Sequence, residues 1–438
     1  MDRILPWALY PYNAQTAHQI DSPANIPNAI STITELGRHS TLAHGSGRSY
    51  GDVCLADSNH VLSMKKMNKV LDVNWETGVI CAQAGITFAE LIALILPRGW
   101  FFPVTPGTQF LTLGGAVAND VHGKNHHVTG TFGRHISSLV IYRSDEGMIE
   151  CSPTKRAELF FATIGGLGLT GIIISVVFQL RPITSSLLEQ RRIRFSSLKE
   201  FFTISEQYHS AYEYMVAWID CLASGKKTGR GICVLGNHAK IGPLEVSPPT
   251  KFSLPKNLPF SLINPFSLRA FNNSYYYRQL KKTVSRLTPY HSILYPLDSL
   301  QLWNHLCGRR GFQQFQFVID KEQAPEIIKT ILQEISRSST TSFFAILKLC
   351  GDLVSPGLMS FPRPGFSLSL DFPQRAEINQ ALFRKLDNIV HMAGGRLYPA
   401  KDAHMNAEHF KQAYPKWSVV ESLRDPKLLS QFWKRVTM

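Results

Sequence analysis

Short apolar runs separated by glycine-rich turns dominate the chain up to residue 182. Continuous or alternating apolar residues predict strands, whereas apolar residues at helical spacing predict helices. The predicted strands cover residues 41–43, 61–64, 70–73, 79–85, 136–142, 148–151 and 172–180. The predicted helices cover residues 27–37, with Pro27 in the first turn, residues 87–97, with Thr87 as the cap, and residues 158–163.

The pattern changes after residue 182, where glycine loops cease and aromatic residues become dense. Residues 243–265 contain six prolines and predict a surface loop. Further strands are predicted at residues 311–319, 343–349 and 366–372, and further helices at 321–336 and 376–393. Because the strands and helices do not alternate as regular βαβ units, we expect an α+β fold.

The composition limits the class of protein. The chain has 438 residues, 44% hydrophobic and 18% charged, which predicts two or three domains with buried cores. No apolar run reaches the roughly 20 residues of a membrane span, and residues 1–12 lack the apolar core of a signal peptide. The seven cysteines are dispersed without a CxxC pair, as expected for reduced thiols in a cytoplasmic protein.

The net charge of +14 favours anionic partners: nucleic acid, a phosphate-bearing substrate or an acidic membrane face. No RNP, zinc-finger or helix-turn-helix signature is present, so we expect no nucleic-acid partner. Peripheral contact with an anionic inner membrane stays open. The alternative is a solvated basic surface with no partner.

Three glycine clusters interrupt the first predicted domain, at residues 44–52, 106–116 and 165–171. Glycine lets the backbone approach a ligand closely, and unhindered backbone N–H groups can cradle a pyrophosphate. The first cluster lacks the third glycine of a Rossmann fingerprint and the Gly-Lys-Ser/Thr end of a Walker A loop. The clusters therefore predict a nucleotide site of neither common type.

These clusters together resemble the FAD-binding domain (PCMH-type) of the vanillyl-alcohol oxidase family. Residues 122–127, 311–317 and 397–402 are further similar to the decaprenylphosphoryl-ribose 2′-oxidases of that family. The resemblance implies a two-domain fold, with an FAD domain at 1–183 and an inserted antiparallel-sheet substrate domain at 184–394. A C-terminal segment, 395–438, is expected to return to the FAD domain.

The resemblance also implies which residues hold the cofactor. Covalent members attach the flavin through a histidine in the first glycine loop, where this sequence has Arg48, so FAD is expected to bind non-covalently. The expected FAD-binding residues are Gly45, Ser46, Gly47, Arg48, Ser49, Tyr50, Gly51, Asp52, Gly107, Thr112, Gly114, Gly115, Asn119, His122, Gly168, Gly171, Ile173 and Tyr398.

Lys401, His122 and Lys124 are the expected catalytic residues. Lys401 matches the family's active-site lysine, and burial can tune a lysine for proton transfer; the alternative is a surface lysine. His122 and Lys124 are expected to face the flavin or a substrate phosphate. His122, His126 and His127 lack a nearby cysteine or second carboxylate, so we predict no metal site.

Gln314 and Gln316 alternate with Phe315 and Phe317, so both glutamines point to one face of the predicted strand. We interpret this as a substrate face whose amides bind hydroxyls; a solvent face is the alternative. Lys348 lies in an apolar strand, where a charged side chain needs an anionic partner such as a substrate phosphate.

Ser367 and Ser369 are also expected to contact the substrate. The resemblance places Asn and Cys at these two positions in the related oxidases, so the substrate contacts of this chain are expected to differ.

The resemblance implies FAD-dependent oxidation of a polyprenyl-phosphate pentose at its 2′-hydroxyl to the keto sugar. This would be the first half of a 2′-epimerisation, completed by a separate NAD(P)H-dependent reductase. One alternative is an alditol or sugar-lactone oxidase of the same superfamily. The other is a non-catalytic basic protein that binds lipid phosphate or nucleic acid.

Overall fold

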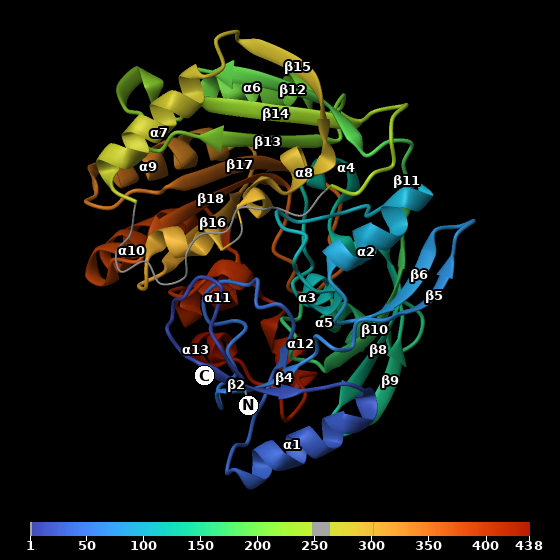
Figure 1. The fold of residues 1–438 in the computed structure, drawn as a ribbon. Helices are drawn as coiled ribbons and strands as arrows, with labels where there is room; N and C mark the ends of the chain where they lie inside the picture. Colours follow the sequence, from blue (N-terminus) through green and yellow to red (C-terminus); the bar gives the residue numbers. More distant parts are fainter. Residues whose placement is uncertain (1, 248–262, 301) are drawn as a thin grey trace.

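The computed structural model describes residues 2–247, 263–300 and 302–438 (Figure 1). The fold is a mixed α+β arrangement in which three smaller sheets are followed along the chain by one large antiparallel sheet; one of the three is only the pair β7 (Trp100–Phe101) and β11 (Arg181–Pro182). Most of the predicted loop at residues 243–265 lies outside the described residues. Across the part of the chain that is described, no helix is long and apolar enough to cross a membrane.

The first small sheet has the order β1-β2-β4-β3. Its strands are β1 (Asp2–Ile4), β2 (Gln15–Gln19), β4 (His60–Ser63) and β3 (Ala43–His44). The predicted helix at 27–37 is observed as α1 (Ile26–Glu35) and buries Ile26 and Ile33. The first glycine loop leaves this sheet directly after β3.

The second small sheet is antiparallel, with the order β5-β6-β10-β8-β9. Its strands are β5 (Val70–Asn74), β6 (Val79–Gln83), β10 (Ile172–Gln179), β8 (Ile136–Arg143) and β9 (Gly147–Cys151), all within a few residues of their predicted bounds. The predicted helix α2 (Phe88–Ile95) begins with a capping box, in which Thr87 accepts from the Glu90 N–H and the Glu90 carboxylate accepts from Thr87. Helix α5 (Ala157–Thr163) is also as predicted.

The second glycine cluster contains a helix that the sequence pattern did not predict, α3 (Leu113–Ala118), with Thr112 as its cap. Two glycines in six residues argue against a helix by propensity. The helix packs against Ala84, however, where a Cβ on Gly114 would lie 2.9 Å from the Ala84 Cβ. Close packing therefore requires the glycine that propensity disfavours.

The large sheet has eight strands in the order β15-β12-β14-β13-β17-β18-β16-β19, and every neighbouring pair is antiparallel. The predicted strands appear as β16 (Phe312–Ile319), β17 (Phe344–Cys350) and β18 (Gly365–Pro373). The strands that the pattern did not resolve are β12 (Leu187–Phe195), β13 (Tyr214–Ile219), β14 (Gly231–His238), β15 (Thr283–Pro289) and β19 (Arg396–Leu397).

One face of this sheet is covered by α6 (Leu198–Tyr208) and by the predicted helices α9 (Ala324–Arg337) and α10 (Ala376–Met392). Phe315 and Phe317 of β16 point into this core. The opposite face carries Gln314 and Gln316 and turns toward the glycine loops. One face of the sheet therefore packs into an apolar core, and the other presents polar side chains toward the glycine loops.

The last part of the chain joins the large sheet to the N-terminal sheet. Strand β19 pairs with β16 at the sheet edge. The helices α11 (Ala407–Ala413), α12 (Trp417–Ser422) and α13 (Gln431–Thr437) follow, and Ser430 forms a bridge with Ala56 near the first glycine loop. Figure 1 shows the two chain ends close together below the large sheet. The domain boundaries at 183 and 394 stay predictions.

Candidate active site

A cavity of about 630 Å³ lies between the three glycine clusters and the polar face of the large sheet. This volume is typical of small-molecule and cofactor sites. Most of the predicted site residues line it. They are Gly45, Ser46, Gly47, Arg48, Ser49, Tyr50, Gly107, Thr112, Gly114, Gly115, Asn119, His122, Lys124, Gly168, Gly171, Ile173, Gln314, Gln316, Lys348, Ser369, Tyr398 and Lys401.

Three predicted residues lie behind the cavity wall: Gly51, Asp52 and Ser367. Gly51 contacts the C-terminal segment, because a Cβ at this position would lie 1.7 Å from the Asp402 carbonyl oxygen. Asp52 pairs with Arg435. Ser367 is buried and accepts a hydrogen bond from the Gln316 amide at 3.2 Å. These residues support the site from behind.

The first glycine loop offers backbone donors to the cavity. Ser46, Gly47, Arg48 and Ser49 all line the cavity, and within the described part of the chain their backbone N–H groups have no hydrogen-bond acceptor. Gly47 has φ +61°, which turns successive amides and creates a concave arrangement suited to an anion. This loop fits the pyrophosphate of the FAD that the sequence resemblance implies.

The third glycine cluster leaves room for a ligand. Gly168 has φ +75°, and a Cβ built on it would meet no protein atom within 4 Å. Its backbone therefore faces open space inside the cavity rather than a packed neighbour. A side chain there would project into the cavity.

Three buried polar atoms of the cavity residues also lack a partner within the described chain: Arg48 Nε, Asn119 Oδ1 and His122 Nδ1. A buried polar atom without a hydrogen bond is costly, so such atoms in a binding site point to a missing ligand. Together with the free loop amides, they show that the donor and acceptor set of this cavity fits a flavin dinucleotide.

The two glutamines of β16 lie in the cavity wall, and the alternative of a solvent face is wrong. Gln314 and Gln316 are 8% and 7% exposed. The Gln314 amide donates to the Asp371 carboxylate at 2.5 Å. The Gln316 amide lies 3.4 Å from His122 Nε2. Each glutamine thus retains further hydrogen-bonding capacity toward the cavity.

Three lysines project into the cavity, and burial lowers the pKa of each. The pKa of Lys124 falls to about 7, and those of Lys348 and Lys401 fall to about 8. Lys124 Nζ donates to the Leu294 carbonyl at 2.6 Å. Burial and the neighbouring Lys348 hold the pKa of His122 well below its usual value, so this imidazole is neutral at pH 7.

Lys401 lies where the first glycine loop meets the sheet. Its Nζ is 3.5 Å from the centre of the Tyr50 ring and 3.4 Å from the Arg48 carbonyl oxygen. Asp371 opposes the effect of burial and raises the pKa of Lys401. Burial in turn raises the pKa of Asp371 to about 7. A lysine and an aspartate with shifted pKa values in one cavity can hold and pass a proton near pH 7.

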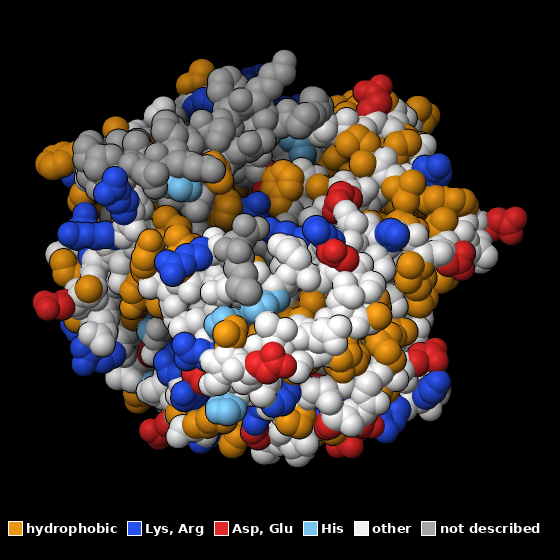
Figure 2. All heavy atoms as spheres, turned by 60° about the horizontal axis from the view of Figure 1, so that its bottom comes forward, with side chains coloured by type: hydrophobic (Ala, Val, Ile, Leu, Met, Phe, Trp, Pro, Cys, Tyr) orange, Lys and Arg blue, Asp and Glu red, His pale blue; other side chains and the backbone are white. Residues whose placement is uncertain are grey.

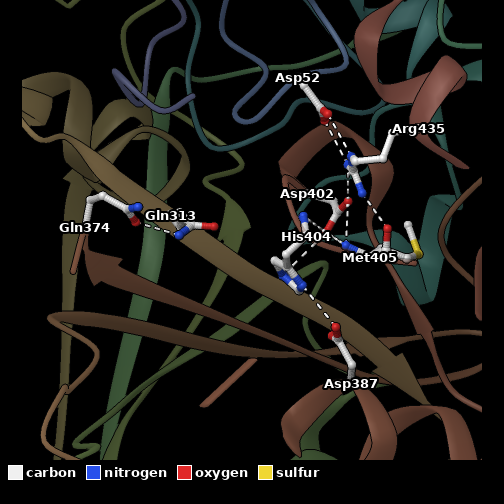
Figure 3. A network of polar contacts seen from close by, with 8 residues as sticks. All are labelled: Asp52, Gln313, Gln374, Asp387, Asp402, His404, Met405 and Arg435. Atoms are coloured by element: carbon white, nitrogen blue, oxygen red, sulfur yellow. Dashed lines mark hydrogen bonds and ion pairs between the residues drawn. The ribbon is translucent and has the colours of Figure 1, made fainter. Parts of the chain in front are cut away.

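A chain of charged groups anchors the segment that carries Lys401 (Figure 3). Arg435 of α13 donates to both carboxylate oxygens of Asp52, at 2.8 and 2.9 Å, and to Asp402 at 2.8 Å. His404 lies 3.4 Å from Asp402 and 3.1 Å from Asp387 of α10. Although burial opposes the shift, the two carboxylates raise the pKa of His404.

The other histidines of the 122–127 segment have structural contacts. His126 Nδ1 accepts from the Gly351 N–H at 3.2 Å, and His127 Nε2 lies 3.0 Å from the Tyr212 carbonyl oxygen. Among the described residues no group of three or more His, Cys, Asp or Glu side chains could hold a metal ion.

Sequence reasoning missed two carboxylates and two tryptophans in the cavity wall: Asp371, Asp298, Trp7 and Trp303. Asp371 could have been found by the argument used for Lys348, since it too lies in an apolar strand. Trp7 carried no such signal; its ring lies 3.7 Å from the Arg48 guanidinium through tertiary contact alone.

The sequence comparisons agree with this geometry. The family model described as FAD binding domain matches residues 18–152. Decaprenylphosphoryl-beta-D-ribose oxidase of Mycolicibacterium smegmatis is 32% identical over 97% of this chain and 94% of its own length. L-gulonolactone oxidase of Mus musculus is 29% identical over 32% of this chain and 31% of its own length. The chain therefore belongs to the family of FAD-linked oxidoreductases that includes decaprenylphosphoryl-beta-D-ribose oxidase.

Proposed function

We propose that this protein oxidises the 2′-hydroxyl of a polyprenyl-phosphate-linked pentose to the keto sugar, the first half of a 2′-epimerisation. One observation carries the proposal: a cavity joins the glycine loops to a sheet face that presents Gln314, Gln316 and Lys348, with Lys124 and Lys401 also in its wall. The full-length similarity to decaprenylphosphoryl-beta-D-ribose oxidase supports the same substrate class. A separate NAD(P)H-dependent reductase would complete the epimerisation.

When bound, FAD would supply the redox chemistry, with residues of the three glycine clusters holding it. We propose that it binds non-covalently, because Arg48 occupies the attachment position and stacks on Trp7 instead. Acid precipitation should then release the yellow chromophore into the supernatant. Flavin that stays with the pellet would contradict non-covalent binding.

The protein's own groups orient the sugar and handle its proton. Gln314 and Gln316 would bind sugar hydroxyls from the β16 side, and Lys348 and Lys124 would neutralise the substrate phosphate. Lys401 Nζ, in its neutral form, would accept the proton of the reacting hydroxyl. Asp371 also lies in the cavity wall and would offset the positive charge of the protonated lysine.

The test is the absorption spectrum of the purified protein under anaerobic conditions. Polyprenyl-phosphate ribose should bleach the flavin band, whereas L-gulono-1,4-lactone and simple alditols should not. Bleaching by the lactone or an alditol, but not by the lipid-linked pentose, would overturn the substrate proposal.

The principal rival is an alditol or sugar-lactone oxidase, which the partial similarity to L-gulonolactone oxidase favours. Rapid peroxide release with these substrates in air would identify it. A non-catalytic phosphate-binding protein is the second rival, and a colourless purified protein would identify that one.

A further inference from the structure

Helix α7 (Pro265–Tyr277) and the turn that leads into β15 form a basic surface segment free of acidic residues. From Ile263 to Leu297 the sequence has no Asp or Glu and five Lys or Arg residues. By contrast, the face in Figure 2 shows Lys and Arg mixed with Asp and Glu over its lower half. The net positive charge of the protein is therefore not spread evenly along the chain.

The inward face of α7 packs beside the cavity. Leu268 joins a cluster that contains Tyr50 and Trp303, and both of these residues line the cavity. Tyr276 packs against Trp218 and Ile232 of the large sheet. Helix α7 therefore lies on the sheet face that carries the active site, at the margin of the cavity (Figure 1, upper left).

Strand β17 connects α7 to the interior of the site. Phe344, Ile346 and Lys348 alternate along this strand and so share one face, and all three line the cavity. Phe344 and Ile346 also pack against the cluster of Trp218, Ile232 and Tyr276, of which Tyr276 belongs to α7. An apolar path thus runs from Lys348, the proposed phosphate partner, to the underside of α7.

The outward face of this segment presents apolar side chains to solvent. Phe266 is 86% exposed and Leu280 is 87% exposed. Phe271 and Tyr277 of α7 are also exposed. Four large apolar side chains exposed within residues 266–280 indicate an interaction site rather than scattered single exposure.

Basic side chains surround these apolar residues. Arg269, Arg278 and Lys281 are exposed, as are Lys282 and Arg286. Lys282 pairs with Glu200 of α6 at 2.6 Å, so part of its charge is neutralised. Aromatic and aliphatic residues that protrude among lysines and arginines match the interface of an anionic bilayer, where apolar tips enter the headgroup layer and cations meet lipid phosphates.

We infer that α7 and the turn into β15 dock this protein onto an anionic lipid membrane, with the cavity mouth against the bilayer. The role of this docking rests on the proposed function, because a polyprenyl substrate could extend its headgroup along β17 to Lys348 while its chain stays in the lipid. The same surface would bind vesicles that contain no substrate, so the docking step is separable from catalysis.

The experiment is vesicle co-sedimentation of the full-length holoenzyme. The wild type should sediment with vesicles of phosphatidylcholine containing phosphatidylglycerol and stay in solution with phosphatidylcholine alone. Arg278→Glu combined with Lys281→Glu, and separately Phe266→Ser combined with Leu280→Ser, should each weaken binding at least about tenfold. Each basic residue near an anionic surface changes partitioning by about fivefold. Charge reversal has about twice this effect in free energy, because it removes a favourable charge and adds an unfavourable one.

Matched controls come from α10, on the opposite side of the large sheet. Arg384→Glu combined with Lys385→Glu changes the same number of exposed charges, and Met392→Ser removes an apolar side chain that is also 87% exposed. Both should leave vesicle binding unchanged. All variants should keep the flavin spectrum of the wild type, which excludes misfolding.

Two outcomes would overturn the inference. One is equal loss of binding in the α7 and α10 variants, which would mean that only net charge matters. The other is unchanged vesicle binding together with loss of a dimer in the α7 variants, which would identify the surface as a contact between two copies. A failure of substrate to bleach the flavin would count against the proposed function but not against docking.

Discussion

At the scale of single residues, the cavity buries two groups of opposite charge, the Lys401 amine and the Asp371 carboxylate. Burial lowers the pKa of Lys401 to about 8 and raises that of Asp371 to about 7, and the charge of each residue partly opposes the shift of the other. The sequence placed Lys401, Lys348 and both glutamines in one site from motif and strand alternation. The apolar strand could have indicated Asp371 as a buried charge, but not its coupling to Lys401, because residues 371 and 401 come together only in the fold.

Lys401→Ala should retain the flavin spectrum and lose substrate-dependent bleaching by about 10²–10⁴-fold, the usual effect of removing a general base. Lys401→Arg should not restore the rate, since a guanidinium stays protonated. Stopped-flow absorbance under anaerobic conditions measures both. Bleaching of Lys401→Ala at the wild-type rate would remove Lys401 from the mechanism.

The bleaching rate should rise with pH through about 8, where Lys401 becomes neutral. Asp371→Asn removes a negative charge that raises the pKa of Lys401, so the midpoint of this pH profile should move to lower pH. Asp298→Asn is the control, because Asp298 also lines the cavity but is not among the charges that shift the pKa of Lys401. An unchanged midpoint in Asp371→Asn would show that the two side chains are not coupled.

At the scale of elements, helix caps and strand periodicity predicted α1, α2, α9 and α10 and the central strands within a few residues. The elements between residues 184 and 294 were not resolved, and β12 illustrates why. Its arginines look out of place in a strand, yet Arg194 donates to the Gln279 carbonyl at 2.7 Å and Arg192 to Tyr275 at 3.3 Å. These partners come from α7 and the residues after it, more than 80 positions away.

The contact between the first glycine loop and the C-terminal segment depends on Gly51. Its φ is +65°, and a Cβ at this position would lie 1.7 Å from the Asp402 carbonyl oxygen, so no side chain fits. Gly51→Ala should lower the free energy of unfolding by about 3 kcal/mol or more, from backbone strain plus collision.

Gly147→Ala provides the control for this effect. Gly147 has φ +78° with nothing within 4 Å of its Cβ position, so only strain of about 1 kcal/mol applies. Denaturant titration of the two variants separates the contributions. Equal losses in both would mean that the loop can move away from Asp402 freely.

At the scale of the whole molecule, the ion network of Asp52, Arg435, Asp402, His404 and Asp387 ties the first glycine loop to two helices from the last third of the chain. The folded-state pKa of His404 is raised. Its contribution to stability is therefore fully present below about pH 6.5 and is lost as pH rises through the folded-state value.

The difference in Tm between wild type and His404→Gln should accordingly be larger at pH 6 than at pH 9. Differential scanning fluorimetry across this range measures it. His409→Gln is the control. Burial lowers the pKa of His409, so the pH dependence of its contribution to stability has the opposite sign. A His404→Gln difference that does not vary with pH would mean that this histidine is neutral in the folded protein.

Both walls of the cofactor cavity meet at Lys401 and Arg48, which are 353 positions apart in the sequence. A ribosome that adds roughly 5–20 residues per second needs about 20 to 70 s to reach Lys401 after it has added Arg48. Throughout that interval the glycine loop has emerged without Tyr398, Lys401 and Asp402 to close it. The cavity is therefore complete only when residues 398–402 have been synthesised, and a chain that stops before them lacks this part of the wall.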